Sequence, residues 1–226
     1  MTRSVVVTGG TGGLGAAVTQ AFLDDGWRVV VPWVQERELE RVQGHERLAT
    51  VRADLMDPES AAGVVAEAGA ELRALVNLVG GFAQGGRVHE TPVEDFEAQL
   101  RLNLRPTYLM CAAAIPAMLA AGGGAIVCVS SRAALRPFPG AAGYITAKAA
   151  VLALVDALHA EYRDDGIRTN AILPSTIDTP ANRRAMPDAE FDRWVKPQEI
   201  ARVIGFLCSD DAAVTSGAHV PVYGRA

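Results

Sequence analysis

Residues 5–15 of the chain read Val5-Val6-Val7-Thr8-Gly9-Gly10-Thr11-Gly12-Gly13-Leu14-Gly15. The three valines are a short β-branched run, which is typical of a buried parallel strand. An amphipathic stretch follows the last glycine and extends to about Asp24, with Gly26 suited to end a helix. Glycines between a strand and a helix let the backbone turn tightly and approach a pyrophosphate at the helix N-terminus. The stretch therefore predicts a strand, a nucleotide-binding loop and a helix.

Two glycine patterns overlap in this loop. Gly10, Gly12 and Gly15 have the spacing G-x-G-x-x-G that is common in dinucleotide-binding folds. Thr8 and Gly9, followed by Gly13 and Gly15, also fit a second and narrower spacing. A G-x-G-x-x-G pattern alone is a weak signal, but the predicted strand and helix around it favour nucleotide binding over a plain glycine turn.

The second predicted strand, Arg28–Trp33, bears on which cofactor would bind. In dinucleotide-binding folds an acidic residue near the end of this strand holds a ribose 2′-hydroxyl, and a basic residue holds a 2′-phosphate. Trp33 and Val34 offer neither group. Glu36 and Arg37 lie slightly further on, and either could reach the ribose. The sequence therefore leaves the choice between NAD and NADP open.

Further apolar runs of strand length follow at residues 48–53, 72–79, 126–131, 167–173 and 218–223. Stretches with helical periodicity separate them, and in the longest, Pro92–Ala120, Asn103 and Pro106 predict an interruption and a kink. Strands that alternate with helices predict one α/β domain over residues 1–226. Its expected architecture is a single-domain, Rossmann-type, doubly wound parallel sheet of about seven strands with helices on both faces.

One segment breaks this alternation. Residues 176–195 are polar, charged and proline-bearing, and they follow the sixth predicted strand. Loops of this kind often close over a site at the strand ends, so the segment is predicted to be a mobile lid.

Composition limits the classes of function. The chain has 226 residues, is 50% hydrophobic and carries a net charge of -5. Its length and apolar content allow one sizeable core, and its acidity argues against electrostatic binding of nucleic acid or anionic membranes. We expect no signal peptide, and no apolar run that approaches the roughly 20 residues needed to span a bilayer.

Cysteine and histidine usage gives no sign of a metal site. Cys111, Cys128 and Cys208 are scattered and odd in number, which fits free thiols in a reducing cytoplasm. The histidines, at positions 45, 89, 159 and 219, share no ligand-like spacing with cysteines or acids. We therefore expect no bound metal.

Tyr144 and Lys148 form the strongest candidate for catalysis. They lie four residues apart in an apolar, alanine-rich stretch with helical periodicity, so both side chains share one helix face. A tyrosine is a poor acid or base near neutrality because its ordinary pKa is about 10. A fixed positive charge within about 4–6 Å favours the phenolate, so Lys148 is expected to lower the pKa of Tyr144.

Ser131 could join this pair. It closes the predicted strand at residues 126–131, and open α/β sheets place their chemistry at strand ends. From there its hydroxyl could donate a hydrogen bond to a substrate oxygen. Taken alone, a serine at a strand end is ordinarily a turn or cap residue.

With these motifs in place, the chain resembles the short-chain dehydrogenase/reductase family over almost all of its length. The features that carry the resemblance are the narrower glycine spacing, Asp54-Leu55, Asn77-Leu78-Val79-Gly80, Asn103, Ser131, the Tyr144/Lys148 pair, and the segment from Asn170 through Pro174 to Thr179. Pro174-Ser175 replaces the usual Pro-Gly, and Gly224-Arg225 replaces the usual terminal Gly-Gly.

The resemblance implies a role for each of four catalytic candidates. Tyr144 would move the proton, and Lys148 would bind the nicotinamide ribose and keep the phenol acidic. Ser131 would polarise the substrate carbonyl, and Asn103 would anchor a water that relays protons. The implied reaction is hydride transfer between the nicotinamide of NAD or NADP and a carbonyl or alcohol.

The resemblance also implies a cofactor site. Within it, glycines would cradle the phosphates, Asp54-Leu55 would hold the adenine, Asn77 the loop beside the ribose, and Thr179 would touch the carboxamide. The full set of expected cofactor-binding residues is Gly9, Thr11, Gly12, Gly13, Leu14, Gly15, Trp33, Asp54, Leu55, Asn77, Gly80, Tyr144, Lys148, Pro174, Ile177 and Thr179.

The lid carries a second and narrower resemblance, to dihydropteridine reductases. Its residues 173–194 and the loop Gly80-Gly81-Phe82-Ala83 are similar to the same regions of those enzymes. In that case the substrate would be a quinonoid or conjugated heterocycle, on which Phe82 or Trp194 could stack. The chain departs from them in keeping Ser131 and Asn103.

A third possibility is a non-catalytic nucleotide-binding sensor with the same fold, although the full set of catalytic candidates argues against it.

The helices near residues 95–120 and 145–165 are apolar enough to pair across a two-fold axis. Family analogy then implies a homodimer or homotetramer in the cytoplasm.

Overall fold

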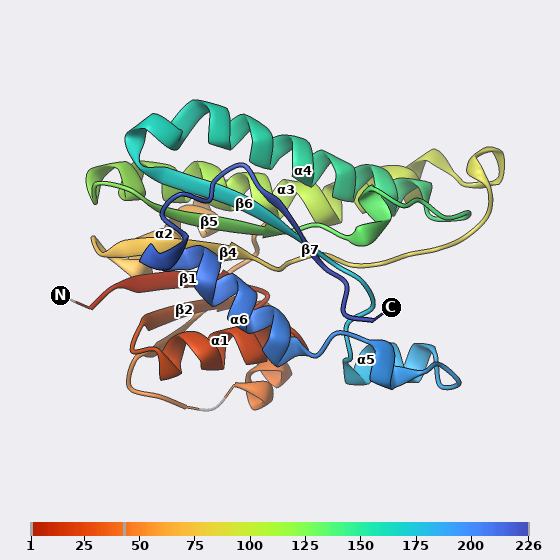
Figure 1. Ribbon diagram of the computed structural model, residues 1–226, viewed down its shortest axis with the longest axis horizontal. Coiled ribbons are helices and arrows are strands. Elements are labelled where there is room, and N and C mark those ends of the chain that lie inside the picture. Colours follow the sequence, from red (N-terminus) through yellow and green to blue (C-terminus); the bar gives the residue numbers. More distant parts are fainter. Residues whose placement is uncertain (1, 43, 226) are drawn as a thin grey trace.

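The computed structural model describes residues 2–42 and 44–225, and a parallel sheet forms its centre (Figure 1). The strands are β1 (Ser4–Thr8), β2 (Arg28–Trp33), β3 (Leu48–Arg52), β4 (Leu72–Asn77), β5 (Gly124–Val129), β6 (Ile167–Pro174) and β7 (His219–Val222). Their order is β3-β2-β1-β4-β5-β6-β7, and every neighbouring pair is parallel. The chain winds outward in one direction from β1 and in the other from β4. This confirms the predicted doubly wound sheet of seven strands.

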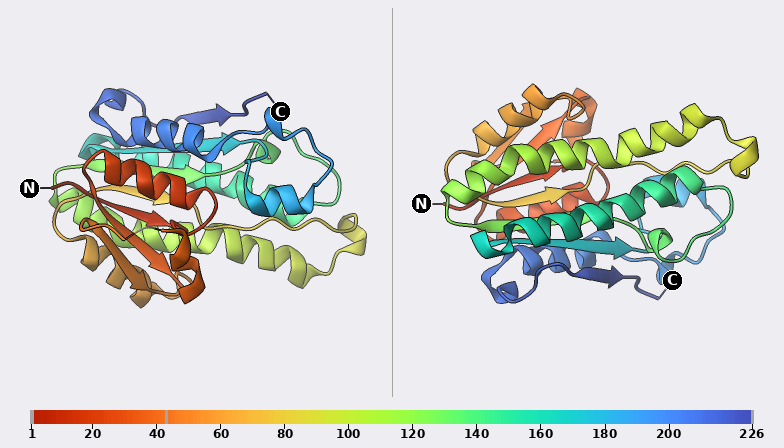
Figure 2. Two further views of the ribbon diagram at one scale, coloured as in Figure 1. Left: turned by 90° about the horizontal axis from the view of Figure 1, so that it is seen from below. Right: turned by 90° about the horizontal axis from the view of Figure 1, so that it is seen from above.

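Helices cover both faces of the sheet (Figure 2). One face carries α2 (Pro58–Ala68), α3 (Val93–Ala120) and α4 (Ala142–Tyr162), and the other carries α1 (Gly15–Asp24) and α6 (Pro197–Cys208). Along β1 the side chains alternate, since Val6 packs into the core under α2, α3 and α4 while Val5 and Val7 pack under α1 and α6. A strand that is buried on both faces needs apolar residues at every position, which explains the uninterrupted valines.

The long helix α3 differs from the expectation. It runs unbroken from Val93 to Ala120 with Pro106 and Pro116 inside it, so the predicted interruption is wrong. An internal proline removes one backbone hydrogen bond and costs about 3 kcal/mol. Fully buried residues such as Met110 and Met118 pack α3 into the core, and this long-range packing outweighs the local cost.

The expectation of no membrane-length apolar run was also wrong. Within the described residues, one helical segment, Ala142–Asp165, is long and apolar enough to cross a bilayer by length and composition alone. The core helix of a soluble protein passes the same test, so the segment is weak evidence for a membrane span. It comprises α4, which packs against α3 and β6.

Candidate active site

The loop between β1 and α1 fits the phosphates of a dinucleotide. A Cβ atom on Gly15 would lie 1.9 Å from the carbonyl oxygen of Gly9, so no other residue could take this path. Gly9 itself has a φ of +66°, which glycine adopts without strain. Leu14 precedes α1 without a side-chain cap, and no acid lies in the first turn. The amide of Ala16 donates to the carbonyl of Gly12 at 2.9 Å, so the loop closes onto the first turn of α1. No side chain competes there with an anion, which the helix dipole favours.

The lid segment, defined as residues 176–195, begins against this loop. A Cβ atom on Gly13 would lie 3.0 Å from the methyl carbon of Thr179, whose hydroxyl caps the short helix α5 (Pro180–Ala185). Ile177 bridges to Val195, so the two ends of the lid segment are held together. The structure thus brings Thr179, expected near the nicotinamide, next to the glycine loop.

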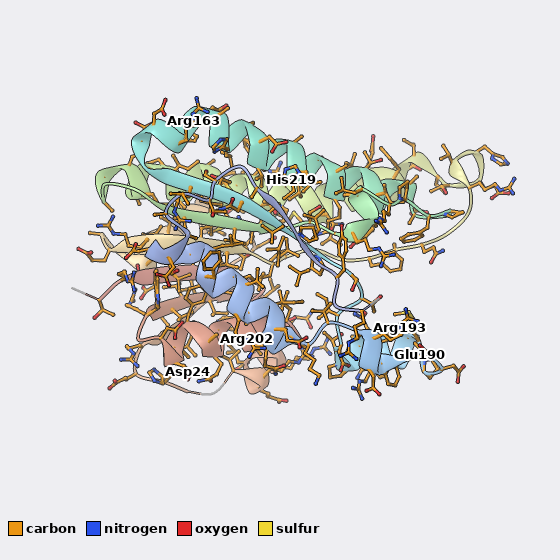
Figure 3. The ribbon with its side chains drawn as sticks, viewed as in Figure 1. Asp24, Arg163, Glu190, Arg193, Arg202 and His219 are labelled. Atoms are coloured by element: carbon orange, nitrogen blue, oxygen red, sulfur yellow. The ribbon has the colours of Figure 1, made fainter. Side chains whose placement is uncertain are left out.

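The lid segment is internally connected, and Figure 3 labels Glu190 and Arg193 within it. Two hydrogen bonds join Arg183 to Asp178, and the guanidinium holds the pKa of that carboxyl below its ordinary value. The same guanidinium lies 4.6 Å from the ring centroid of Phe191, which contacts Trp194 edge-on at 4.9 Å. Arg193 donates to the carbonyl of Arg225, which attaches the C-terminal segment to the lid segment.

The catalytic candidates lie at the carboxyl ends of β4 and β5. Lys148 is buried, and its Nζ donates to the carbonyl of Val129 at 3.0 Å and lies 5.9 Å from the ring centroid of Tyr144. The phenol of Tyr144 is hydrogen-bonded to the side chain of Ser131. The register of α4 and the end of β5 therefore bring Ser131, Tyr144 and Lys148 together, as the sequence predicted.

Asn103 holds the loop after β4 against this group. Its Oδ1 accepts from the amide of Gly81 at 3.1 Å, and its Nδ2 donates to the carbonyl of the same residue at 3.0 Å. A Cβ atom on Gly80 would lie 2.6 Å from Oδ1 of Asn103 and 3.0 Å from Nζ of Lys148. Gly80 is therefore needed because the backbone passes close to two candidate site residues.

The expectation of an acidic phenol is wrong for the protein without its cofactor. Burial raises the pKa of Tyr144 above its ordinary value of 10.0, and the hydrogen bond from Ser131 only partly opposes this. Burial also lowers the pKa of Lys148 from 10.5 to about 8. Sequence spacing showed the neighbouring ammonium, but it did not show that both groups leave water on folding, and loss of water disfavours both charged forms.

Asn77 lies in a buried strand, where a polar side chain needs hydrogen-bond partners. Its Nδ2 lies 3.4 Å from the sulfur of Cys111 and 3.6 Å from that of Cys128, and its Oδ1 is buried without a hydrogen-bond partner. The packing of α3 over β4 and β5 creates this arrangement. Nothing in the local sequence of β4 indicated it. Asn77 does pair in register with Thr8, whose hydroxyl accepts from the amide of Leu78 at 3.1 Å.

At the end of β2, the structure places different charged residues near the glycine loop from those expected. Glu36 and Arg37 are exposed. Thr11 instead donates to Glu38 at 3.4 Å, and Arg41 donates to the carbonyl of Thr11 at the same distance. The segment Glu36–Arg41 forms a 3₁₀ helix, in which residues three apart share a face. The three-residue spacing of Glu38 and Arg41 is the signal in the sequence that indicates this pair.

Three other expected cofactor residues flank this region. Trp33 ends β2, and its indole Nε1 is buried without a hydrogen-bond partner. Asp54 turns the chain after β3 by accepting from the amide of Met56 at 3.0 Å, and Leu55 is buried. Over residues 2–42 and 44–225, no group of three or more histidines, cysteines or acids could hold a metal ion.

The chain is similar to known proteins over almost its whole length. A family model described as enoyl-(acyl carrier protein) reductase matches residues 9–224. The 2-(R)-hydroxypropyl-CoM dehydrogenase of Xanthobacter autotrophicus is 34% identical and covers 99% of this chain and 98% of its own length.

Solved structures agree with this finding. ElxO with NADP bound has a TM-score of 0.91 and 26% identity, covering 99% of this chain and 98% of its own. A short chain dehydrogenase/reductase family protein has a TM-score of 0.89 and 30% identity, covering 98% and 96%. The 3-ketoacyl-(acyl-carrier-protein) reductase from Brucella melitensis, complexed with NADH, has a TM-score of 0.90 and 28% identity, covering 99% and 98%.

Proposed function

Since this chain belongs to the short-chain dehydrogenase/reductase family and is an NAD(P)-dependent oxidoreductase, we propose that Ser131, Tyr144 and Lys148 carry its proton-transfer chemistry, with Asn103 in support. The observation that carries this proposal is the contact of the Ser131 side chain with the Tyr144 phenol, with the buried Lys148 behind them. The substrate is a small molecule with a carbonyl or alcohol group.

The roles follow from the state of each group. A bound nicotinamide supplies or accepts the hydride. The hydroxyls of Ser131 and Tyr144 donate hydrogen bonds to the substrate oxygen, where negative charge develops during reduction. Because the pKa of Tyr144 is raised, the phenol holds its proton at neutral pH and is ready to give it to that oxygen. Lys148 then stabilises the phenolate that remains.

The test is the variant Tyr144→Phe. We expect it to bind reduced cofactor nearly as well as the wild type and to lose turnover with every carbonyl substrate, because only the proton donor is removed. Cofactor oxidation with a panel of aldehydes, ketones and quinonoid pterins measures the loss, and a fluorescence titration measures binding. Retained turnover by the variant would remove Tyr144 from its proposed role.

The cofactor preference is proposed to depend on Glu38 and Arg41, since both contact the glycine loop at Thr11. An acid favours the 2′-hydroxyl of NAD, and an arginine favours the 2′-phosphate of NADP. Titrations of NADH and NADPH into the wild type, Glu38→Gln and Arg41→Ala decide which contact dominates. Equal changes for both cofactors in both variants would show that neither residue discriminates.

A dihydropteridine-reductase-like activity is the second candidate. Phe82 favours it, because this ring is 59% exposed beside Tyr144 and could stack on a flat heterocycle. Trp194 is 9% exposed and already packed against Phe191. Competition between a simple ketone and a quinonoid dihydropterin distinguishes the two candidates. A nucleotide-binding sensor would instead bind cofactor without oxidising it in the presence of any of these compounds.

The outer face of α3 and α4 is proposed to be the interface of a homodimer or homotetramer. A hollow of about 680 Å³ lies on this face, lined by Leu100, Arg101, Leu104, Arg105, Tyr108, Ala150 and Leu154. Tyr108 is 57% exposed there. Sedimentation of Tyr108→Glu against the wild type tests this surface, and an unchanged mass would contradict it.

A cytoplasmic location is also proposed. Cys111, Cys128 and Cys208 are all buried free thiols, which fits a reducing compartment. Fractionation of the producing cells tests this location, and recovery of the protein with the membrane or exported fractions would contradict it.

A further inference from the structure

Phe82 contacts two other aromatic rings, and one of them is the candidate catalytic phenol of Tyr144. The ring centroid of Phe82 lies 5.1 Å from that of Tyr144, with the two planes at 90°. The ring centroid of Phe82 also lies 6.2 Å from that of Phe138, with the planes at 51°. We call Phe82 and Phe138 the aromatic wall. Both are substantially exposed, at 59% and 40%, although exposing large apolar rings to water is unfavourable.

The aromatic wall is held in place by its backbone. Phe82 lies in the loop between β4 and α3, and Phe138 lies in the loop between β5 and α4. The amide of Gly85 donates to the carbonyl of Gly140 at 2.7 Å, and Nε2 of Gln84 donates to the carbonyl of Pro139 at 3.2 Å. These bonds tie the two loops together.

Gly140 makes this approach possible, and Gly81 is fixed next to Phe82. Gly140 has a φ of +83°, and a Cβ atom there would lie 2.5 Å from the carbonyl oxygen of Gly85. Gly81 directly precedes Phe82 in the chain, and two hydrogen bonds fix its peptide to Asn103. The aromatic wall is therefore preformed, which reduces the entropic cost of binding a rigid ligand.

A second aromatic cluster, Phe191 and Trp194 in the lid segment, already has other side chains packed on its rings. In the lid segment, Phe191 packs edge-on against Trp194, and the guanidinium of Arg183 lies over its ring. The aromatic wall has its apolar surface available and shares one ring contact with Tyr144. A group that binds there lies beside the phenol that meets the substrate oxygen.

We propose that Phe82 and Phe138 bind an aromatic ring attached directly to the reacting carbonyl or carbinol carbon, so that aryl ketones and aryl carbinols are the preferred substrate class. This inference rests on the proposed function, because it places the substrate oxygen at Tyr144. An aromatic ring gains more than a saturated ring of similar size, because edge-to-face and offset contacts with phenylalanine add to area burial.

The test compares acetophenone with cyclohexyl methyl ketone, which differ in the ring alone. The measured quantity is the ratio of their kcat/KM values in the wild type, Phe82→Leu and Phe138→Leu. Leucine keeps apolar bulk and removes the ring, so we expect each variant to lower the ratio by about 3- to 10-fold, the range that aromatic pairs contribute. Using the change in ratio removes the different intrinsic reactivity of the two ketones.

The matched control is Phe206→Leu. Phe206 is 48% exposed in α6, on the other face of the sheet, and its replacement should leave the ratio at the wild-type value. Thermal unfolding of all three variants checks that they fold. A ratio unchanged by both Phe82→Leu and Phe138→Leu would overturn the proposal. So would a loss of oligomeric mass in Phe82→Leu, because a second copy of the chain would then be what covers the ring.

A binding measurement separates this proposal from the proposed function. Saturation-transfer NMR with Tyr144→Phe reports acetophenone binding without turnover. Two results together would support the aromatic wall and contradict the reaction: Phe82→Leu weakens acetophenone binding, and the wild type oxidises no cofactor. Ketone reduction with an unchanged ratio would support the reaction and contradict the aromatic wall.

Discussion

Replacing Lys148 with methionine should change how the stability of the cofactor-free protein depends on pH. Lys148 is 5% exposed, and its Nζ donates to the carbonyl of Val129. Burial lowers its pKa from 10.5 to about 8, while the nearby thiol of Cys128 acts in the opposite direction. The native protein therefore holds this proton less tightly than the unfolded chain does.

The sign and size of the effect follow from the two pKa values. Between about pH 8 and pH 10.5, unfolded chains still carry the proton that native molecules have lost, so the free energy of unfolding rises with pH. The lysine should add about 1.3 kcal/mol between pH 7 and pH 9, and about 3 kcal/mol once pH exceeds 10.5. Methionine has a similar length and does not titrate, so Lys148→Met lacks this increment.

The assay is urea unfolding of wild type and Lys148→Met at pH 7, 8 and 9. The quantity of interest is the difference in unfolding free energy between the two proteins, because Tyr144, Cys111 and Cys208 are present in both. Cys128 belongs to the measured difference, since the pKa of this thiol is lowered by its hydrogen bond with Cys111 and also by the charge of Lys148. From pH 7 to pH 9, we expect the unfolding free energy of the wild type to rise by about 1.3 kcal/mol relative to that of the variant.

The control is Lys196→Met, which removes an exposed lysine just before α6. Its difference from the wild type should stay constant from pH 7 to pH 9. A wild-type advantage over Lys148→Met that stays flat, or falls as pH rises, would refute the claim that Lys148 is destabilised by burial of its charge.

Three further substitutions test other parts of the structure. Gly15→Ala should raise the dissociation constant for reduced cofactor at least about 10-fold in a fluorescence titration, because the new Cβ would lie 1.9 Å from a carbonyl oxygen; unchanged affinity would contradict the tight loop. Gly63→Ala has open space around it in the middle of α2, so urea unfolding should show a gain of about 0.5–1 kcal/mol, and a loss would contradict the described packing. Ser131→Ala should slow single-turnover hydride transfer by about 10²–10³ with little change in cofactor affinity, and an unchanged rate would remove Ser131 from the catalytic set.

Much of the scaffold could be predicted because it depends on local sequence. The valine runs gave buried parallel strands, since strands covered on both faces carry apolar residues at every position. Gly9 and Gly15 marked the loop because their backbone conformation and close approach exclude larger residues. The spacing of Tyr144 and Lys148 placed both on one turn of α4.

Predictions failed where a distant part of the chain decided the outcome. Pro106 did not break α3, because the core that surrounds the helix outweighs the missing hydrogen bond. The contacts of Asn77 could not be predicted from β4 alone, because α3 and β5 bring Cys111 and Cys128 beside it.

The sequence by itself determined the order of strands and helices, the glycine loop and the identity of the catalytic candidates, because periodicity, glycine conformation and helix spacing act within a few residues. The tertiary structure alone decided that Tyr144 keeps its proton, that Arg41 reaches Thr11, and that Phe82 meets Phe138. These properties depend on burial and on contacts between segments far apart in the chain, and both exist only after the helices have packed on the sheet.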